Sequence, residues 1–273
     1  MTNQNKMTPW RKVSTAVYTP PSDGKIYGKI EVDVTDMMEY MFEQRRKGNK
    51  LTPTHFVSAA IARTLYEDVP DINCFIRRGH VVMREEAEVF VSVALERGKD
   101  MTGVLIPKTQ DRSVSNIAEY LYKEVQKKRS GEDSGAESTK YALAKIPWPF
   151  RRWIFRFIKW WIYSLGFKLP FVDAPRDPFG SIVLSNIGSH GLSTGMAALF
   201  PIAKIPAVLV MGKVEKKPVV VKDEVVIRSI MPLTATMDHR IMDGAQAGAL
   251  ARGISRRLRH PEKLDKPREQ KPD

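Results

Sequence analysis

The segment Met237-Asp-His-Arg-Ile-Met-Asp-Gly244 places several ionisable residues in a row next to an apolar stretch. The residues before it, 230–236, predict a strand that leads into the segment, and residues 245–258 predict a helix with small residues on one face. Polar groups on a tight turn between two rigid elements are in a typical position for a functional site. By itself, however, a histidine followed four residues later by Asp-Gly is a weak signal.

The rest of the chain mixes predicted strands and helices without a fixed period, which favours a single α/β domain without repeats. Strands are expected at 26–34, 81–83, 89–95, 104–107, 182–188, 207–211 and 219–230, the last with a turn at 222–223. Helices are expected at 37–46, 52–65 and 117–125, where apolar residues recur at helical spacing. Thr35 and Asp36 are expected to cap the first helix, and Thr52 or Thr54 the second. Polar residues predict a surface loop at 129–140 and a frayed tail after Arg259.

Length and composition limit the possible functions. The 273 residues, of which 42% are hydrophobic, are enough for a sizeable core. The single cysteine, Cys74, fits a reducing compartment, and the N-terminus lacks the apolar core of a signal peptide, so we expect a cytoplasmic protein. No cluster of Cys and His has metal-ligand spacing, so we expect no metal. The net charge of +13 comes without a recognisable nucleic-acid motif, so we expect no nucleic-acid partner.

Residues 234–244 resemble the Asp-His-Arg-x-x-Asp-Gly signature of the dihydrolipoamide acyltransferase components of 2-oxoacid dehydrogenase complexes. That family shares a His-x-x-x-Asp-Gly motif with chloramphenicol acetyltransferase. Further blocks resemble the family, in the family's order: Lys29-Ile-Glu-Val-Asp-Val-Thr35, Leu51-Thr-Pro-Thr-His-Phe-Val57, Gly103-Val-Leu-Ile-Pro107, Leu184-Ser-Asn-Ile-Gly188 and Val225-Val-Ile-Arg-Ser-Ile-Met-Pro-Leu-Thr234. The resemblance runs from about Trp10 to Leu258 and is interrupted by residues 130–175.

The resemblance implies a chloramphenicol acetyltransferase-like fold. This is an α/β architecture, an α+β two-layer sandwich with a mixed sheet flanked by helices. We expect an acyltransferase catalytic domain over residues 1–262, with a helical insertion at 130–175, and a polar tail over 263–273. The resemblance also implies a homotrimer, or a higher oligomer based on trimers, with each active site between two subunits.

The resemblance assigns the central roles to two residues. His239 would be the general base that takes the proton from the attacking thiol, and Ser185 would donate a hydrogen bond to the oxyanion of the tetrahedral intermediate. Without the resemblance, Ser185 is explained as well by a turn beside Asn186 and Gly188. We expect Asn186 to support the site structurally.

Three further residues would support the site structurally. Asp243 would pair with an arginine near the N-terminus, for which Arg11 is the candidate. A solvated Arg11 is the alternative, with Lys12 as a rival partner. Gly244 would permit the tight backbone that holds Asp243 in place. The remaining histidines, including His55, show no partner pattern, so satisfied or solvated roles are expected for them.

The implied reaction is direct acyl transfer between coenzyme A, as acyl-CoA, and a thiol or another small acceptor. Family components carry lipoyl and partner-binding domains before the catalytic part, whereas here the resemblance begins near residue 10. We therefore expect no lipoyl-lysine on this chain, and acyl delivery from free acyl-CoA or from a lipoyl domain in trans. The alternative from another functional class is a non-catalytic trimeric assembly protein.

Residues 148–165 predict a basic, aromatic, amphipathic helix within the insertion. Its apolar positions recur at a spacing of three and four, and Arg152, Arg156 and Lys159 lie on the opposite side. Charged residues interrupt it too often for a transmembrane helix. Packing on its own protein or across a trimer contact, binding to a membrane surface, and a lid over the acyl channel all fit this pattern. Of these three alternatives, binding to a membrane surface predicts a peripheral location at the membrane.

Overall fold

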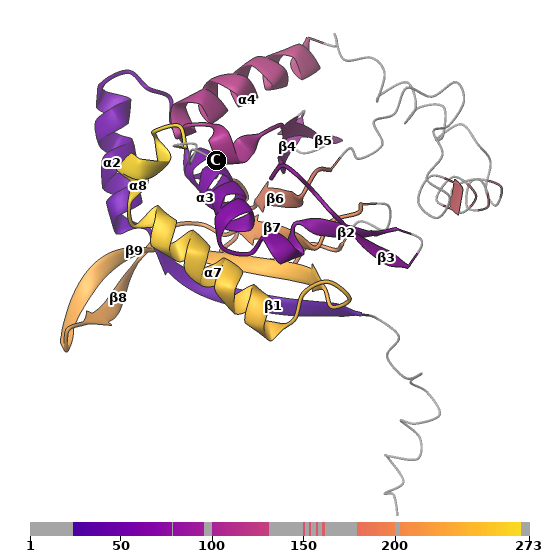
Figure 1. Ribbon diagram of the computed structural model, residues 1–273. Coiled ribbons are helices and arrows are strands. Elements are labelled where there is room, and N and C mark those ends of the chain that lie inside the picture. The colour runs from indigo at the N-terminus through magenta and orange to yellow at the C-terminus, as the bar shows by residue number, and fades with distance from the viewer. Residues whose placement is uncertain are drawn as a thin grey trace, which may run out of the picture.

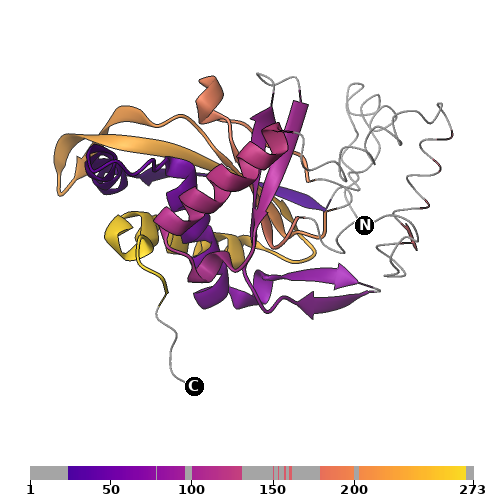
Figure 2. The same ribbon diagram turned by 90° about the horizontal axis from the view of Figure 1, so that it is seen from above.

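The computed structural model describes residues 24–77, 79–95, 100–130, 150, 153, 157, 160, 161, 179–199 and 203–268. A twisted mixed sheet forms one layer, and helices cover one of its faces (Figure 1). Figure 2 shows the same arrangement from above. The predicted mixed sheet with flanking helices is confirmed.

The main sheet has the order β1-β9-β7-β6-β4-β5, with β8 paired to the first half of β9. Among the strand pairs of the described residues, β4–β6 and β6–β7 are parallel and the others are antiparallel. A separate ribbon consists of β2 and β3. The strands are β1 (Lys25–Asp33), β2 (Cys74–Arg77), β3 (His80–Met83), β4 (Val89–Leu95), β5 (Asp100–Ile106), β6 (Ile182–Asn186), β7 (Ala207–Met211), β8 (Glu215–Val221) and β9 (Glu224–Asp238).

The described helices lie where apolar residues recur at helical spacing. They are α2 (Thr35–Arg46), α3 (Pro53–Glu67), α4 (Val114–Arg129), α7 (Gly244–Leu258) and α8 (Pro261–Leu264), with 3₁₀ turns η1 (Pro70–Ile72), η3 (Thr109–Asp111) and η5 (Gly188–His190). The predicted hairpin turn is confirmed, because Lys222 and Asp223 both have positive φ, as a two-residue hairpin requires. The ribbon strand β2 was not expected from the sequence.

The core lies mainly between the helices and one face of the sheet. Ten consecutive residues of α3, Phe56 to Leu65, are buried, so this helix is covered on all sides. Leu184 of β6 and Leu233 of β9 contribute to the same cluster from the sheet. A smaller cluster on the other face contains Val208 and Val210 of β7. The sheet is thus covered unequally, with its thicker layer on the helical face.

Two local predictions were wrong. Thr35 and Asp36 do not cap α2, because the helix already begins at Thr35 and Val34 is the cap residue. Instead, the Asp33 carboxylate accepts hydrogen bonds from the Thr35 amide at 3.0 Å and from its hydroxyl at 2.6 Å. The side chain of Asp33, the residue before the cap residue Val34, therefore accepts hydrogen bonds from the first residue of the helix.

The chain after Arg259 is not frayed as far as residue 268. The buried Arg63 guanidinium donates hydrogen bonds to the carbonyls of Lys263 at 2.8 Å and Leu264 at 3.3 Å. The Asp265 carboxylate accepts hydrogen bonds from the Ser115 amide at 2.9 Å and hydroxyl at 2.7 Å. The polar composition of this segment predicted a frayed tail. The prediction was wrong because the residues that hold the segment are far away in sequence and cannot be recognised from its composition.

Candidate functional site

His239 lies at the point where the β1–β9 ladder ends. The ladder pairs Lys25 with Asp238, and the next amide, that of His239, still donates a hydrogen bond to the Gly24 carbonyl at 2.8 Å. The Nδ1 atom of His239 lies 3.1 Å from the carbonyl oxygen of Met242, which can only accept. In the neutral ring Nδ1 therefore carries the proton, and Nε2 is left with its lone pair. His239 is exposed, so Nε2 is available as a base.

The two acidic residues of the turn have separate partners. Burial alone would raise the pKa of Asp238, but hydrogen bonds from Arg240 hold that pKa below its ordinary value. The Arg240 Nε donates to the Asp238 carboxylate at 2.9 Å. Asp243 is the cap residue of α7 and accepts a hydrogen bond from the Ala245 amide at 2.8 Å. The side chain of Gln246 completes a capping box, so Asp243 joins the turn to the helix.

The local backbone of the structure does not require a glycine at position 244, in contrast to the expectation from the sequence. Gly244 begins α7, has no positive φ, and has open space where a Cβ atom would lie. Within the chain, the cap formed by Asp243 holds the turn, so a glycine is not required by local geometry. The predicted partner Arg11 and its rival Lys12 lie outside the described residues.

Ser185 is the fourth residue of β6, near the carboxyl end of the strand. Its neighbour Leu184 belongs to the core under the helices, whereas Val183 packs in the smaller cluster on the other face. Because side chains alternate along a strand, the Ser185 hydroxyl points to the same face as Val183. Within the described part of the chain this hydroxyl makes no hydrogen bond, so it is available to a ligand.

Backbone contacts position the loop after Ser185. The Ile187 amide donates to the Met211 carbonyl at 3.0 Å, and the Lys213 amide donates to the Leu192 carbonyl at 2.9 Å. A Cβ atom at Gly188 would lie 2.6 Å from the Gly212 carbonyl oxygen. The two loop backbones thus approach so closely that only glycine fits between them.

His239 and Ser185 do not meet within one chain. Ser185 is in register with Val210 of β7, which pairs with Thr234 of β9. His239 lies five residues beyond Thr234, past the opposite end of β7. Two strand spacings of about 4.8 Å and five residues of about 3.3 Å separate the two residues by roughly 19 Å. A site that uses both side chains therefore needs two chains.

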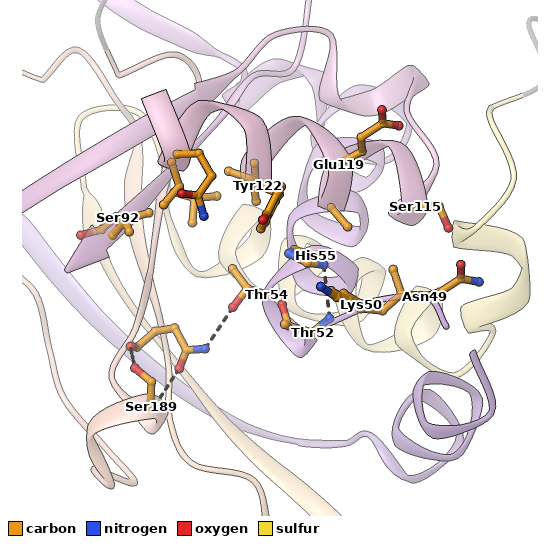
Figure 3. A pocket seen from close by; sticks show the side chains of 18 of the residues that line it. Asn49, Lys50, Thr52, Thr54, His55, Ser92, Ser115, Glu119, Tyr122 and Ser189 are labelled. Atoms are coloured by element: carbon orange, nitrogen blue, oxygen red, sulfur yellow. Dashed lines mark hydrogen bonds between the residues drawn. The ribbon is translucent and has the colours of Figure 1, made fainter. Parts of the chain in front are cut away.

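A groove of about 1050 Å³ lies beside the end of β6. It is bounded by the loop before α3, the start of α3, strand β4 and one face of α4 (Figure 3). Both Ser185 and Asn186 line it. Ligands of sheets with parallel strands commonly bind at the carboxyl ends of those strands, and this groove lies at the ends of β4 and β6.

Asn186 connects the end of β6 to the start of α3. Its side-chain amide donates to the Thr54 hydroxyl oxygen at 3.0 Å, and its carbonyl oxygen accepts from the Ser189 amide at 3.3 Å. The Thr54 hydroxyl accepts this bond and donates none within the described residues, so its own proton is available to the groove. The supporting role of Asn186 stays a prediction, and these two hydrogen bonds are what would hold its side chain at the groove.

His55 belongs to the groove, which the sequence did not indicate. Its Nδ1 atom accepts a hydrogen bond from the Thr52 amide at 3.2 Å, so the ring proton is on Nε2. Burial, with a smaller effect from the charge of Arg45, lowers the pKa of His55 to about 4. A neutral His55 thus offers an N–H donor. The helix-entry motif marked the position of this residue, but only the fold places it in the same groove as Asn186.

The insertion is described at a few positions only. Of its aromatic residues, Phe150, Trp153, Phe157 and Trp160 have side chains that are 50–69% exposed. Phe157 stacks on Trp161, with their ring centroids 5.8 Å apart. The rest of the predicted helix at 148–165 and the loop at 131–149 lie outside the described residues. Among the residues that are described, no helix has the length and apolarity needed to span a bilayer, and no group of side chains could hold a metal ion.

Comparison with known proteins identifies the family. The family described as 2-oxoacid dehydrogenases acyltransferase (catalytic domain) matches residues 11–140 and 179–265. Residues 141–178 lie between the two matched segments, and they contain most of the insertion predicted at 130–175.

One curated relative is the dihydrolipoyllysine-residue acetyltransferase component of the acetoin cleaving system of Bacillus subtilis (strain 168). It is 25% identical over 221 residues, which are 81% of this chain and 44% of the relative. The chain thus spans less than half the length of this relative.

Solved structures show the same fold. A probable dihydrolipoamide acetyltransferase from Listeria monocytogenes 4b F2365 aligns with a TM-score of 0.63 at 20% identity, covering 97% of this chain and 96% of the other. The cubic core of the pyruvate dehydrogenase multienzyme complex aligns with a TM-score of 0.65 at 17% identity, covering 89% and 84%.

Proposed function

Because the chain belongs to the family of 2-oxoacid dehydrogenase acyltransferase catalytic domains, we propose that it transfers an acyl group between coenzyme A and a thiol acceptor. The acceptor would be a dihydrolipoyl group or a small molecule with a similar thiol. Family membership supports the class of reaction. The residues at the two ends of β7 support the mechanism.

The observation that carries the proposal is the hydrogen bond between Nδ1 of His239 and the Met242 carbonyl. This bond fixes the tautomer and leaves Nε2 as an unprotonated nitrogen on an exposed turn. A histidine held in this way can remove a proton from a thiol near neutral pH. The exposed position of His239 leaves room for a substrate and for a second chain.

The proposed reaction has one covalent intermediate, and it forms on the substrate. Nε2 of His239 takes the proton from the acceptor thiol, whose sulfur attacks the carbonyl carbon of the acyl-CoA thioester. The carbonyl oxygen becomes an oxyanion and accepts a hydrogen bond from the Ser185 hydroxyl. When the intermediate collapses, the bond to the CoA sulfur breaks and that sulfur takes the proton from His239.

We further propose that the two side chains of each site come from different subunits of a homotrimer. The separation of roughly 19 Å within one chain supports this arrangement. A cubic assembly has threefold axes, and one solved structure with a similar fold is described as a cubic core. Pairing of Asp243 with Arg11 would then add to the cap that holds the His239 turn.

The deciding experiment compares three proteins. In His239→Ala, transfer from acyl-CoA to dihydrolipoamide should fall at least about a hundredfold, because the base is lost. The matched control is His80→Ala, since His80 is an exposed histidine of the β2–β3 ribbon. Circular dichroism should be unchanged in both variants. Equal turnover of His239→Ala and wild type would contradict the assignment of the base.

The same experiment distinguishes the non-catalytic alternative. If wild type neither turns over any acyl-CoA nor binds coenzyme A in calorimetry, a trimeric assembly protein becomes the better interpretation. Binding of coenzyme A without turnover would still count against the proposed enzyme. The two measurements together therefore separate the enzyme from the scaffold.

Exposed aromatic residues of the insertion support a second candidate function, which is peripheral binding to a membrane surface. Aromatic side chains near basic residues suit the interface of an anionic bilayer. Wild type should float with liposomes that contain phosphatidylserine, and a variant with Trp153, Trp160 and Trp161 all changed to alanine should not. In the control variant, the exposed residues Val220, Val225 and Ile227 of the β8–β9 hairpin are all changed to alanine. Equal flotation of the tryptophan variant and wild type would reject this candidate.

A further inference from the structure

Asp238, the last residue of β9, holds the turn that follows it with its backbone. Its amide donates a hydrogen bond to the Pro206 carbonyl at 2.8 Å, which fastens the turn to the segment before β7. Its carbonyl oxygen accepts hydrogen bonds from the amides of Ile241 and Met242, both at 3.0 Å. The turn between β9 and α7 (Figure 1) therefore closes on Asp238, the residue directly before His239.

The side chain of Asp238 is bound on the other side of His239, by Arg240. The Asp238 carboxylate is 13% exposed and accepts hydrogen bonds from the Arg240 amide at 3.0 Å and from Arg240 Nε at 2.9 Å. A second guanidinium nitrogen of Arg240 donates to the other carboxylate oxygen. A guanidinium that contacts both oxygens fixes the direction of a carboxylate as well as its position. The pair thus encloses His239 between two residues that hold each other.

The guanidinium of Arg240 keeps this carboxylate occupied. Burial opposes the charge of Asp238, and the hydrogen bonds from Arg240 outweigh that effect, so that the pKa of Asp238 lies below its ordinary value. Without the Arg240 side chain, a partly buried carboxylate would stand next to His239 with the amide of residue 240 as its remaining partner. A carboxylate is a stronger acceptor than a backbone carbonyl, so it would compete with the Met242 carbonyl for the ring N–H of His239.

We propose that Asp238 and Arg240 are positioning residues for the base, and that their pair keeps the His239 proton on Nδ1. The proposal rests on the proposed acyl transfer and deepens it, because it names the residues that hold the base ready. The connection from the pair to the ring runs through Met242, whose amide binds the Asp238 carbonyl and whose own carbonyl lies 3.1 Å from Nδ1. If the turn loosens, this carbonyl moves away from the ring. The proton can then occupy Nε2, the nitrogen that must accept the thiol proton.

Asp243, the other carboxylate of the turn, has a different role. It accepts a hydrogen bond from the Ala245 amide at 2.8 Å and forms a capping box with Gln246 at the start of α7. Its loss should therefore loosen the start of the helix, whereas loss of the Asp238–Arg240 pair should change the protonation of the His239 ring.

Nitrogen NMR of protein labelled with 15N-histidine tests the proposal directly, because it reports which ring nitrogen carries the proton. The chain has five histidines, so the His239 signals are assigned by comparison with His239→Ala. At a pH where the ring is neutral, wild type should carry the proton on Nδ1. In Asp238→Asn and in Arg240→Gln, a clear share of the signal should move to the form protonated on Nε2.

The same variants should lose turnover in the transfer from acyl-CoA to dihydrolipoamide. We expect kcat to fall about ten- to a hundredfold and KM to change by less than about threefold, because the base is misplaced while binding is kept. Arg240→Lys, which keeps the charge without the forked contact, should retain part of the activity. The matched control is Lys217→Gln, which breaks the 2.8 Å ion pair of Lys217 with Glu31 on β8 and β1. It should leave the His239 signals and kcat unchanged.

Arg240 is 69% exposed, so Arg240→Gln should keep the fold, and circular dichroism checks this. If the proton stays on Nδ1 in both variants, the inference is overturned, even where kcat falls. If wild type transfers no acyl group, the proposed function fails, and the NMR comparison still decides the inference by itself. A shift of the proton to Nε2 in both variants and not in Lys217→Gln would then support it.

Discussion

The turn after β9, which carries His239, and the loop after β6, which follows Ser185, are held in different ways. Hydrogen bonds hold the first, and the Asp243 side chain that caps α7 is close in sequence to His239. Close backbone packing holds the second, at the contact between Gly188 and Gly212. One is a local structure that a motif can encode, and the other depends on segments that meet only in the folded chain.

The two regions also lie at opposite ends of β7. An active centre that needs both regions would therefore lie at an interface between two chains. Within one chain, each region is stabilised by its own contacts. The two regions also differ in the environment of their histidines. The His239 side chain is exposed, whereas His55, at the start of α3 near Ser185, is partly buried and neutral.

The largest expected effect comes from separating the two regions between chains. Ser185→Ala should lower kcat by roughly a hundred- to a thousandfold, and His239→Ala should also lower it by at least a hundredfold. Mixing the two variants under conditions that exchange subunits should restore a measurable part of wild-type turnover, because some interfaces then combine an intact Ser185 with an intact His239. No recovery after verified exchange would mean that each chain supplies a complete site.

Acid should affect the Ser185 region through His55. Its folded pKa of about 4 lies below its ordinary value of 6.5, so the unfolded chain binds the proton more readily between these values. The resulting stability is fully present above about pH 6.5 and is lost as the pH falls towards 4, by at most roughly 3 kcal/mol. Chemical denaturation of wild type and His55→Asn between pH 4 and 7 measures the difference.

The control for this pH dependence is His80→Asn, because His80 is exposed on the β2–β3 ribbon. Its stability should follow the wild-type curve. A wild-type curve parallel to that of His55→Asn would show that His55 does not contribute to the acid dependence.

Backbone packing at the Ser185 loop should be sensitive to a single methyl group. At Gly212 a Cβ atom would overlap the Ser193 carbonyl oxygen, so Gly212→Ala should cost about 1–3 kcal/mol in the free energy of unfolding. Gly244→Ala is the matched control in the other region, where the same methyl group meets open space. Equal urea midpoints for the two variants would contradict the difference between the regions.

The smallest effect is expected at the cap of α7. Asp243→Ala removes the acceptor of the Ala245 amide and should destabilise the protein by about 1 kcal/mol, whereas Asp243→Asn keeps a good cap residue. Thermal unfolding of both variants measures the difference. Equal loss in both would indicate that the charge of Asp243, for instance in a pair with Arg11, matters more than the cap.

Much of the fold could be predicted because its signals are local. Alternation along β1 and helical spacing in α3 and α4 mark these elements, and the predicted hairpin occurs at Lys222 and Asp223. The prediction for the start of α2 was wrong because several polar residues stand close together there. Asp33, rather than Asp36, accepts the hydrogen bond at the helix start. The docking of residues 260–268 could not be predicted, because Arg63 is about 200 residues away in sequence.

The candidate site shows the same division. His239, Ser185 and Asp243 could be named from motifs because each motif is a short run of residues that shapes its own turn. The sequence around His55 does not indicate a site, because a polar residue near a helix start is ordinary and its hydrogen bond with Thr52 is local. Its place in the groove depends on the contact between Thr54 and Asn186, which are 132 residues apart.

Local patterns along the chain were therefore sufficient to recognise the family, the order of most elements and the two turns that carry His239 and Ser185. Hydrophobic spacing and turn chemistry act over a few residues, so they can be recognised along the chain. Three features became visible only in the folded chain: these turns lie at opposite ends of β7, glycine packing holds one of them, and residues at the start of α3 line a groove beside Ser185. These features depend on strand order and register, which bring distant residues together and which no local pattern specifies.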